Sequence, residues 1–216
     1  MNQKNLKEIT KETRVWSPNL DIALPIETAS IPRFKKWVNW NGFSDKHHAY
    51  DFAAYMNDKN ECVFGLPEET KVRAVADGVV TGYLDKSDLL NLLGEYDNYM
   101  ATITIEHGKE GNGLSSVYTH INPLVKKGQH VKKGDVIATG YKDGGYKGVG
   151  RLVHLHFEMR NSCNIKDGIV NPATFFPQID RYRATPQGSP EFQILGLSEQ
   201  PEIYTAHFKK VLVNNS

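Results

Sequence analysis

Two histidines, His154 and His156, stand two residues apart in the run LVHLHFEM at residues 152–159. If this run forms a strand, successive side chains alternate between two faces, so both imidazoles share one face with Glu158. The other face is wholly apolar and is predicted to belong to the core. Two imidazoles on one face can bind one metal ion or act on one substrate, although such a pair also occurs on surface strands that have no function.

Two further clusters contain residues of the same chemical types. The pentapeptide His47-His48-Ala49-Tyr50-Asp51 offers imidazole nitrogens and a carboxylate. Catalytic zinc sites use such donors as three protein ligands and keep a fourth position open for water. The alternative for this pentapeptide alone is a solvated turn with a local His–Asp hydrogen bond. His120 ends the run Tyr118-Thr119-His120, and residues at strand ends and in the following loops often form functional sites.

The elements that would position these side chains are mostly strands. Residues 100–107 alternate Ala101, Ile103 and Ile105 with polar neighbours, which is the pattern of a half-buried strand. The pair Asp77-Gly78 separates two β-prone runs, 72–76 and 79–84, and predicts a hairpin.

The sequence Val-Lys-Lys-Gly occurs twice in succession, ending at Gly128 and Gly134. This repeat predicts two tight turns in which glycine supplies a positive φ and the lysines point to water. The alternative is a phosphate-binding patch, which a single basic repeat without interleaved aromatic residues supports only weakly.

Taken together and in order, these blocks resemble the M23 zinc metallopeptidases, the lysostaphin-like and LytM-like endopeptidases of bacterial cell walls. The resemblance covers residues 46–159 and extends more loosely to Asn171-Pro172. It is carried by six blocks: His47-x-x-x-Asp51, Val72-Arg-Ala-Val-Ala-Asp77-Gly78-Val79-Val80, Ile103-Thr-Ile-Glu-His107-Gly108, Tyr118-Thr-His120, Gly128-x-x-Val-Lys-Lys-Gly134-Asp-Val-Ile137 and His154-Leu-His-Phe-Glu158.

The resemblance implies one Zn²⁺ per chain, held by His47, Asp51 and His156, with His120 and His154 as the catalytic histidines. Zinc would activate a water molecule and polarise the scissile carbonyl, while the two histidines would transfer protons and steady the oxyanion. His48 is the adjacent competitor for His47 as a ligand.

The other histidines are not assigned to the site. His107 matches a family histidine that does not bind the metal and is expected to be structural. His130 and His207 match no motif and are expected to face solvent.

The resemblance also implies an all-β, mostly antiparallel fold, in which a two-sheet core carries a groove with the metal on its floor. We expect an N-terminal extension at 1–31, the metallopeptidase domain at 32–180 and a C-terminal tail at 181–216. The expected reaction is hydrolysis of a peptide bond in the stem peptide or cross-bridge of peptidoglycan. The alternatives are a wall-binding regulator that has lost catalysis and a zinc peptidase that acts on a non-wall protein.

Composition narrows the range of partners. Lys and Arg number 26 against 25 Asp and Glu, for a formal charge of +1, so no global field favours nucleic acid or an anionic membrane. The sequence predicts no membrane span and shows no signal peptide, and the family resemblance predicts action in the periplasm, the cell wall or outside the cell. Cys62 and Cys163 are too few for a disulfide scaffold and form no CxxC pair.

Overall fold

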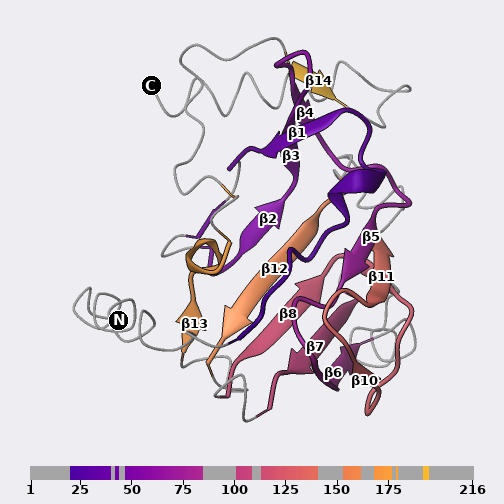
Figure 1. Ribbon diagram of the computed structural model, residues 1–216, viewed down its shortest axis with the longest axis vertical. Helices are drawn as coiled ribbons and strands as arrows, with labels where there is room; N and C mark the ends of the chain where they lie inside the picture. Colours follow the sequence, from indigo (N-terminus) through magenta and orange to yellow (C-terminus); the bar gives the residue numbers. More distant parts are fainter. Residues whose placement is uncertain are drawn as a thin grey trace, which may run out of the picture.

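The described strands form three hydrogen-bonded sheets, as the computed structural model shows (Figure 1). The structure describes residues 20–39, 42–43, 47–84, 101–108, 113–140, 153–161, 168–176, 179 and 192–194. These ranges contain strands and two short 3₁₀ helices, η1 (Thr28–Ser30) and η3 (Pro172–Thr174), and no α-helix. The expected all-β class is therefore confirmed. In these ranges no helix is long and apolar enough to cross a membrane.

The largest sheet has seven strands within the described ranges. Its order is β10 (His130–Val131), β6 (Gly78–Leu84), β7 (Thr102–Glu106), β8 (Ser115–Thr119), β12 (Leu155–Arg160) and β13 (Ile169–Val170), and β2 (Tyr50–Phe52) also pairs with β12. All of its described pairings are antiparallel. The strand β12 is thus flanked on both sides, by β8 on one and by β2 and β13 on the other.

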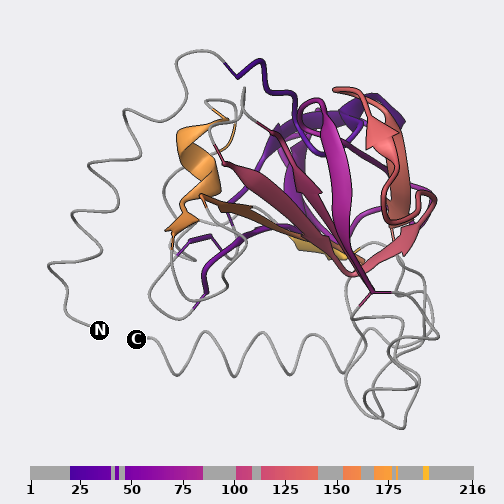
Figure 2. The ribbon, with the colours of Figure 1, turned by 90° about the horizontal axis from the view of Figure 1, so that it is seen from below.

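Two smaller sheets complete the fold. One contains β5 (Lys71–Arg73), β11 (Val136–Gly140) and β9 (Ile121–Pro123) and forms a second layer beside the large sheet (Figure 2). The other contains β1 (Phe34–Trp37), β3 (Ala54–Asn57), β4 (Cys62–Phe64) and β14 (Phe192–Ile194), in which β14 runs parallel to β4. This third sheet is additional to the two-sheet core that the family resemblance implies.

The core lies where the apolar faces of these strands meet. In β12 the burial alternates strictly, with Leu155, Phe157 and Met159 at 0–1% exposure. In β7 the same alternation buries Ile103 and Ile105, so both strands predicted from period-two patterns are confirmed. One face of β12 therefore anchors the strand in the core while the other carries His156 and Glu158.

The hairpin predicted at Asp77-Gly78 is wrong. The strand β5 pairs with β11, whereas β6 pairs with β7 and β10, so the Asp-Gly pair joins strands of different sheets. The Asp77 carboxylate accepts hydrogen bonds from the backbone N–H of Lys133 at 2.8 Å and from Lys132 Nζ at 2.7 Å, which fixes a corner rather than a two-residue turn. A Cβ at Gly78 would lie 2.4 Å from the Glu106 carbonyl oxygen, so this close strand approach requires glycine.

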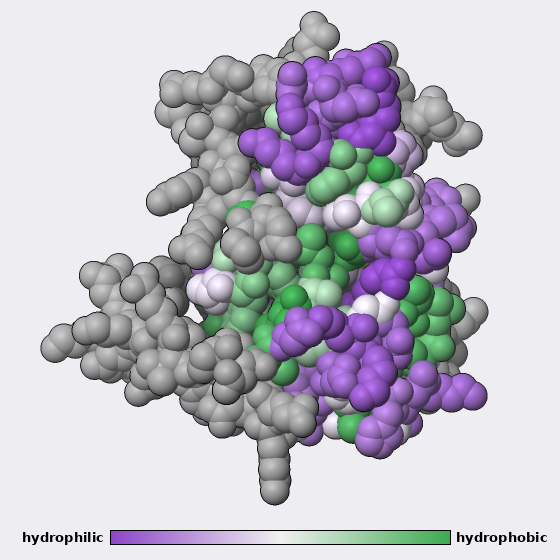
Figure 3. All heavy atoms as spheres, viewed as in Figure 1, coloured by the Kyte–Doolittle hydropathy of each residue, from purple (hydrophilic) through white to green (hydrophobic). Residues whose placement is uncertain are grey.

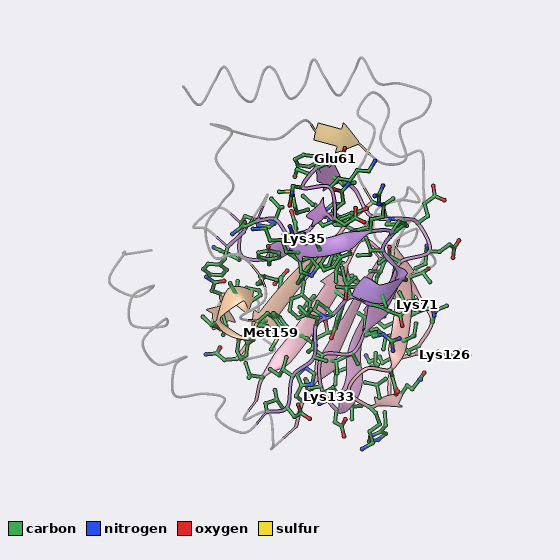
Figure 4. All side chains as sticks on the ribbon, turned by 45° about the horizontal axis from the view of Figure 1, so that its top comes forward. Lys35, Glu61, Lys71, Lys126, Lys133 and Met159 are labelled. Atoms are coloured by element: carbon green, nitrogen blue, oxygen red, sulfur yellow. The ribbon has the colours of Figure 1, made fainter. Side chains whose placement is uncertain are left out.

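The two Val-Lys-Lys-Gly turns are confirmed. Gly128 and Gly134 have φ of 84° and 87°, which glycine adopts without steric penalty. The four lysines of the repeat are exposed, and Figure 4 shows Lys126 and Lys133 at the outer surface.

Residues 20–31, which fall in the expected N-terminal extension, pack against the core. Their backbone follows β5, with hydrogen bonds from Ala23 N to Val75 O at 2.7 Å and from Arg73 N to Pro25 O at 2.8 Å. Ile26 and Ile31 are buried to 3% exposure, and Leu20, Ile22 and Leu24 pack on the core as partly buried side chains. The face of the molecule seen in Figure 3 shows a hydrophobic zone between hydrophilic areas.

Candidate metal centre

The pairing of β2 with β12 brings a carboxylate and an imidazole together from opposite parts of the chain. Asp51 is the register partner of His156, and its Oδ1 lies 3.0 Å from His156 Nδ1. Cross-strand partners share a face, so both side chains lie on the side of the sheet opposite Phe157 and the core. Asp51 is 7% exposed, which makes it a buried carboxylate at the floor of the site.

His47 approaches this pair from the segment that precedes β2. Its Nε2 lies 3.2 Å from Asp51 Oδ1 and 3.2 Å from His156 Nδ1. Its Nδ1 lies 3.2 Å from the Gly42 carbonyl oxygen, which can only accept a hydrogen bond. Nδ1 therefore donates to this carbonyl, which leaves Nε2, the atom that faces the other two residues, as the nitrogen that can bind a metal ion.

The three donors fit a single zinc ion. Ligand atoms at about 2.0–2.1 Å from a tetrahedral zinc ion lie about 3.3 Å from one another. The separations here are 3.0 to 3.2 Å. Two imidazoles and one carboxylate also match the composition of catalytic zinc sites that keep one position for water. In the described part of the chain this is the one group of three such residues whose donors converge.

Electrostatics favours a cation among these residues. Burial of the Asp51 carboxyl opposes its ionisation, but hydrogen bonds with His156 and His47 outweigh it and hold the Asp51 pKa well below its usual range. Burial likewise opposes protonation of His156, and its hydrogen bonds to Asp51 and Glu158 nevertheless raise the pKa of His156 to about 9. The site therefore attracts positive charge, in the form of a proton or a metal ion.

His120 reaches the same place through an unusual backbone conformation. Thr119 is the register partner of His156, so simple alternation would direct residue 120 toward the core. His120 instead has a φ of 66°, in the left-handed region, at the corner between β8 and β9 where the chain changes sheets. Its ring centroid lies 4.7 Å from that of His154 and 5.7 Å from that of His156. Backbone strain of this kind is typical of functional residues.

The structure thus places all five expected site residues in one cluster. His47, Asp51 and His156 form one group, and His120 and His154 lie beside it. His48, the competitor of His47, is exposed and has its ring 6.1 Å from that of Phe43.

The remaining histidines and cysteines lie elsewhere in the fold or outside the described residues. His107 is buried, with Nδ1 2.9 Å from the Asp77 carbonyl oxygen and Nε2 2.9 Å from Ser116 Oγ. His130 is exposed, as expected, and His207 and Cys163 lie outside the described residues. Cys62 is a buried free thiol, and burial raises its pKa to about 11.

Sequence reasoning gave no role to two residues that touch the cluster. Glu158 Oε1 lies 3.3 Å from His156 Nε2, on the ring edge opposite Asp51. Thr119 neighbours His156 across the ladder and shares a hydrogen bond of 3.1 Å with Thr102. Glu158 could have been predicted from its period-two spacing with His154 and His156, which places all three on one strand face. The position of Thr119 beside His156 could be known only from the pairing of β8 with β12.

The chain matches the sequence model of a known protein family. The model of peptidase family M23 matches residues 59–172, more than half of the 216-residue chain. The protein therefore belongs to peptidase family M23. The matched region contains His120, His154 and His156, while His47 and Asp51 precede it and are joined to the site by the fold.

Several solved structures are similar to this chain. The solution structure of lysostaphin shares 20% identity, covering 73% of this chain and 56% of that one, with a TM-score of 0.45. Csd3 from Helicobacter pylori shares 20% identity over 77% and 35%, with a TM-score of 0.43. A zinc-containing peptidase from Vibrio cholerae shares 22% over 64% and 39%, with a TM-score of 0.39. This chain thus spans 35 to 56% of those chains. No curated protein sequence matches the chain.

Proposed function

We propose that this protein is a zinc-dependent endopeptidase that hydrolyses peptide bonds of bacterial peptidoglycan, in the stem peptide or the cross-bridge. The observation that carries the proposal is the convergence of His47 Nε2, Asp51 Oδ1 and His156 Nδ1 beside two further histidines. Membership of peptidase family M23 supports the peptidase class. The resemblance to the cell-wall endopeptidases of that family supports the substrate. We place its action at the cell wall, in the periplasm or outside the cell.

Each residue has a distinct task in this proposal. His47, Asp51 and His156 would hold the zinc ion, which when bound lowers the pKa of water and polarises the scissile carbonyl. The Asp51 carboxylate also keeps the charge of the ligand set negative, because its hydrogen bonds hold its pKa low.

His120 and His154 would carry the proton transfers. Their rings lie 4.7 Å apart, so both can face one scissile bond. One takes a proton from the attacking water and returns it to the leaving amine, and the other donates a hydrogen bond to the developing oxyanion. For both histidines to act on a substrate at the metal, both must lie close to the metal ligands. The His120 ring is 5.7 Å from the His156 ring, and the His154 ring is 4.7 Å from the His120 ring.

The test is mass spectrometry of muropeptides released from purified peptidoglycans of several cross-link types, with and without a zinc chelator. The proposal predicts new amine ends that vanish with chelator and return when zinc is restored. The matched control is His154→Ala, which should retain zinc and release nothing. Absence of release from every wall type by zinc-loaded protein would contradict the substrate, and release that survives complete removal of zinc would contradict the mechanism.

A further inference from the structure

A row of charged side chains continues from the metal cluster along β12. His156, Glu158 and Arg160 alternate with the buried residues Leu155, Phe157 and Met159 and share the face that carries the site. The side chains of Glu158 and Arg160 are only 13% and 14% exposed. A nearly buried ion pair on a strand needs good geometry to offset its desolvation, so its detailed contacts are informative.

The two oxygens of Glu158 have separate partners. Oε2 accepts hydrogen bonds from Arg160, with Nε at 2.7 Å and a terminal guanidinium nitrogen at 2.6 Å. Oε1 lies 3.3 Å from His156 Nε2. The guanidinium therefore fixes the carboxylate and directs its second oxygen to the outer edge of the imidazole ring.

This arrangement determines which nitrogen of His156 faces the metal position. A carboxylate can only accept, so the Nε2 beside it carries the proton. Nδ1 faces Asp51 Oδ1 at 3.0 Å and His47 Nε2 at 3.2 Å, so a metal ion bound there would take the place of a proton on Nδ1, while Nε2 keeps its own proton beside Glu158. An imidazole that donates its outer N–H to a carboxylate is also a more basic metal ligand in a fixed orientation.

We propose that Glu158, held by Arg160, is a positioning residue that selects the Nε2–H form of His156 and thereby directs Nδ1 to the metal. This inference rests on the proposed metal centre and adds to it two residues outside the ligand set. Glu158 acts through His156 and has no direct part in the reaction.

Glutamine is the informative substitution at this position. Glu158→Gln keeps the shape of the side chain but has one carbonyl oxygen, which can serve His156 or Arg160 and not both, while its amide N–H groups face a second donor. The control is Glu69→Gln, which makes the same chemical change at an exposed position outside the His47–Asp51–His156 group.

The first experiment measures zinc affinity by competition with a chromophoric chelator. We expect Glu158→Gln to weaken zinc binding by about 10- to 100-fold, the usual effect of losing such a partner. Glu69→Gln should bind zinc as the wild type does. Equal affinities for Glu158→Gln and wild type would overturn the inference. Failure of the wild type to bind zinc would overturn the metal centre itself, so the wild-type titration separates the two cases.

The second experiment needs no variant and so does not depend on whether one folds. Histidine-selective ¹⁵N NMR of the zinc-loaded wild type reports which nitrogen of His156 bears hydrogen. The inference predicts a proton on Nε2 that exchanges slowly with water, and metal coordination at Nδ1. A proton on Nδ1, with zinc on Nε2, would overturn it.

Discussion

Asp51 and His156 are 105 residues apart in the chain and 3.0 Å apart in space, as register partners across the β2–β12 ladder. Their proximity follows from strand pairing, which fixes both the facing positions and the shared face. His47 completes the group from just outside the ladder.

Removal of one donor from this group should abolish metal binding. We expect His156→Ala to lose the bound zinc and to reduce hydrolysis to background, because two donors hold zinc poorly in a site built for three. The matched control is His48→Ala, since His48 neighbours His47 in sequence but is exposed and lies outside the group. Metal analysis of dialysed protein together with muropeptide release checks both. A His156→Ala protein with full zinc content and full rate would refute the assignment.

Two substitutions at His120 should distinguish its role in catalysis from its effect on stability. Asparagine tolerates the left-handed region, so His120→Asn should retain both zinc and the melting temperature while hydrolysis falls by about 10²- to 10⁴-fold. Valine cannot adopt this φ comfortably, and His120→Val should also lose about 1–3 kcal/mol of stability. Thermal unfolding and hydrolysis rates test the pair. A His120→Asn variant that unfolds early, or one with the wild-type rate, would contradict this division.

The buried His107 should make stability depend on pH. Burial lowers its pKa below the ordinary 6.5, although the hydrogen bond to Asp77 opposes this effect. Between the folded and unfolded pKa values the unfolded state binds more protons, so the free energy of unfolding falls as pH drops from 6.5 toward the folded pKa. Above that range His107 is neutral in both states and contributes no slope.

Urea unfolding of wild type and His107→Gln at a series of pH values measures this effect. The stability advantage of wild type over the variant should shrink below pH 6.5 and stay constant above it. Parallel curves for the two proteins across that range would show that His107 does not titrate as inferred.

The segment before β1 should contribute to the stability of the core. Ile26 is 3% exposed and bridges to Val72, so Ile26→Ala should cost ~2–4 kcal/mol through lost burial and a residual cavity. Leu124 is 60% exposed, and Leu124→Ala should change stability by less than about 0.5 kcal/mol. Urea unfolding of the two variants compares the same kind of truncation in both environments. Equal effects would mean that the segment does not pack on the core in solution.

The sequence patterns were most informative where a local rule governs the structure. Period-two alternation identified β7 and β12, and glycine at the ends of the Val-Lys-Lys-Gly repeats identified two turns, because each feature depends on neighbours in the chain. The Asp77-Gly78 hairpin failed because the tertiary contacts of the Asp77 carboxylate with Lys132 and Lys133 convert a local turn signal into a corner between sheets.

The site required information that local patterns lack. Spacing and family resemblance nominated His47, Asp51, His120, His154 and His156, but neither gives distances or the φ of His120. The contact between Glu158 and Arg160 depends on rotamers along one strand face, and the position of Thr119 beside His156 depends on the register of β8 with β12.

The separation of the three proposed metal ligands along the chain has a consequence for biosynthesis. Two donors precede residue 52, the third is residue 156, and β12 must be in place before His156 can meet Asp51. Every polypeptide interrupted before β12 lacks one of the three donors, so ribosome-bound intermediates and prematurely terminated fragments contain no complete site. The proposed metal site therefore cannot be complete until the chain has been synthesised through β12.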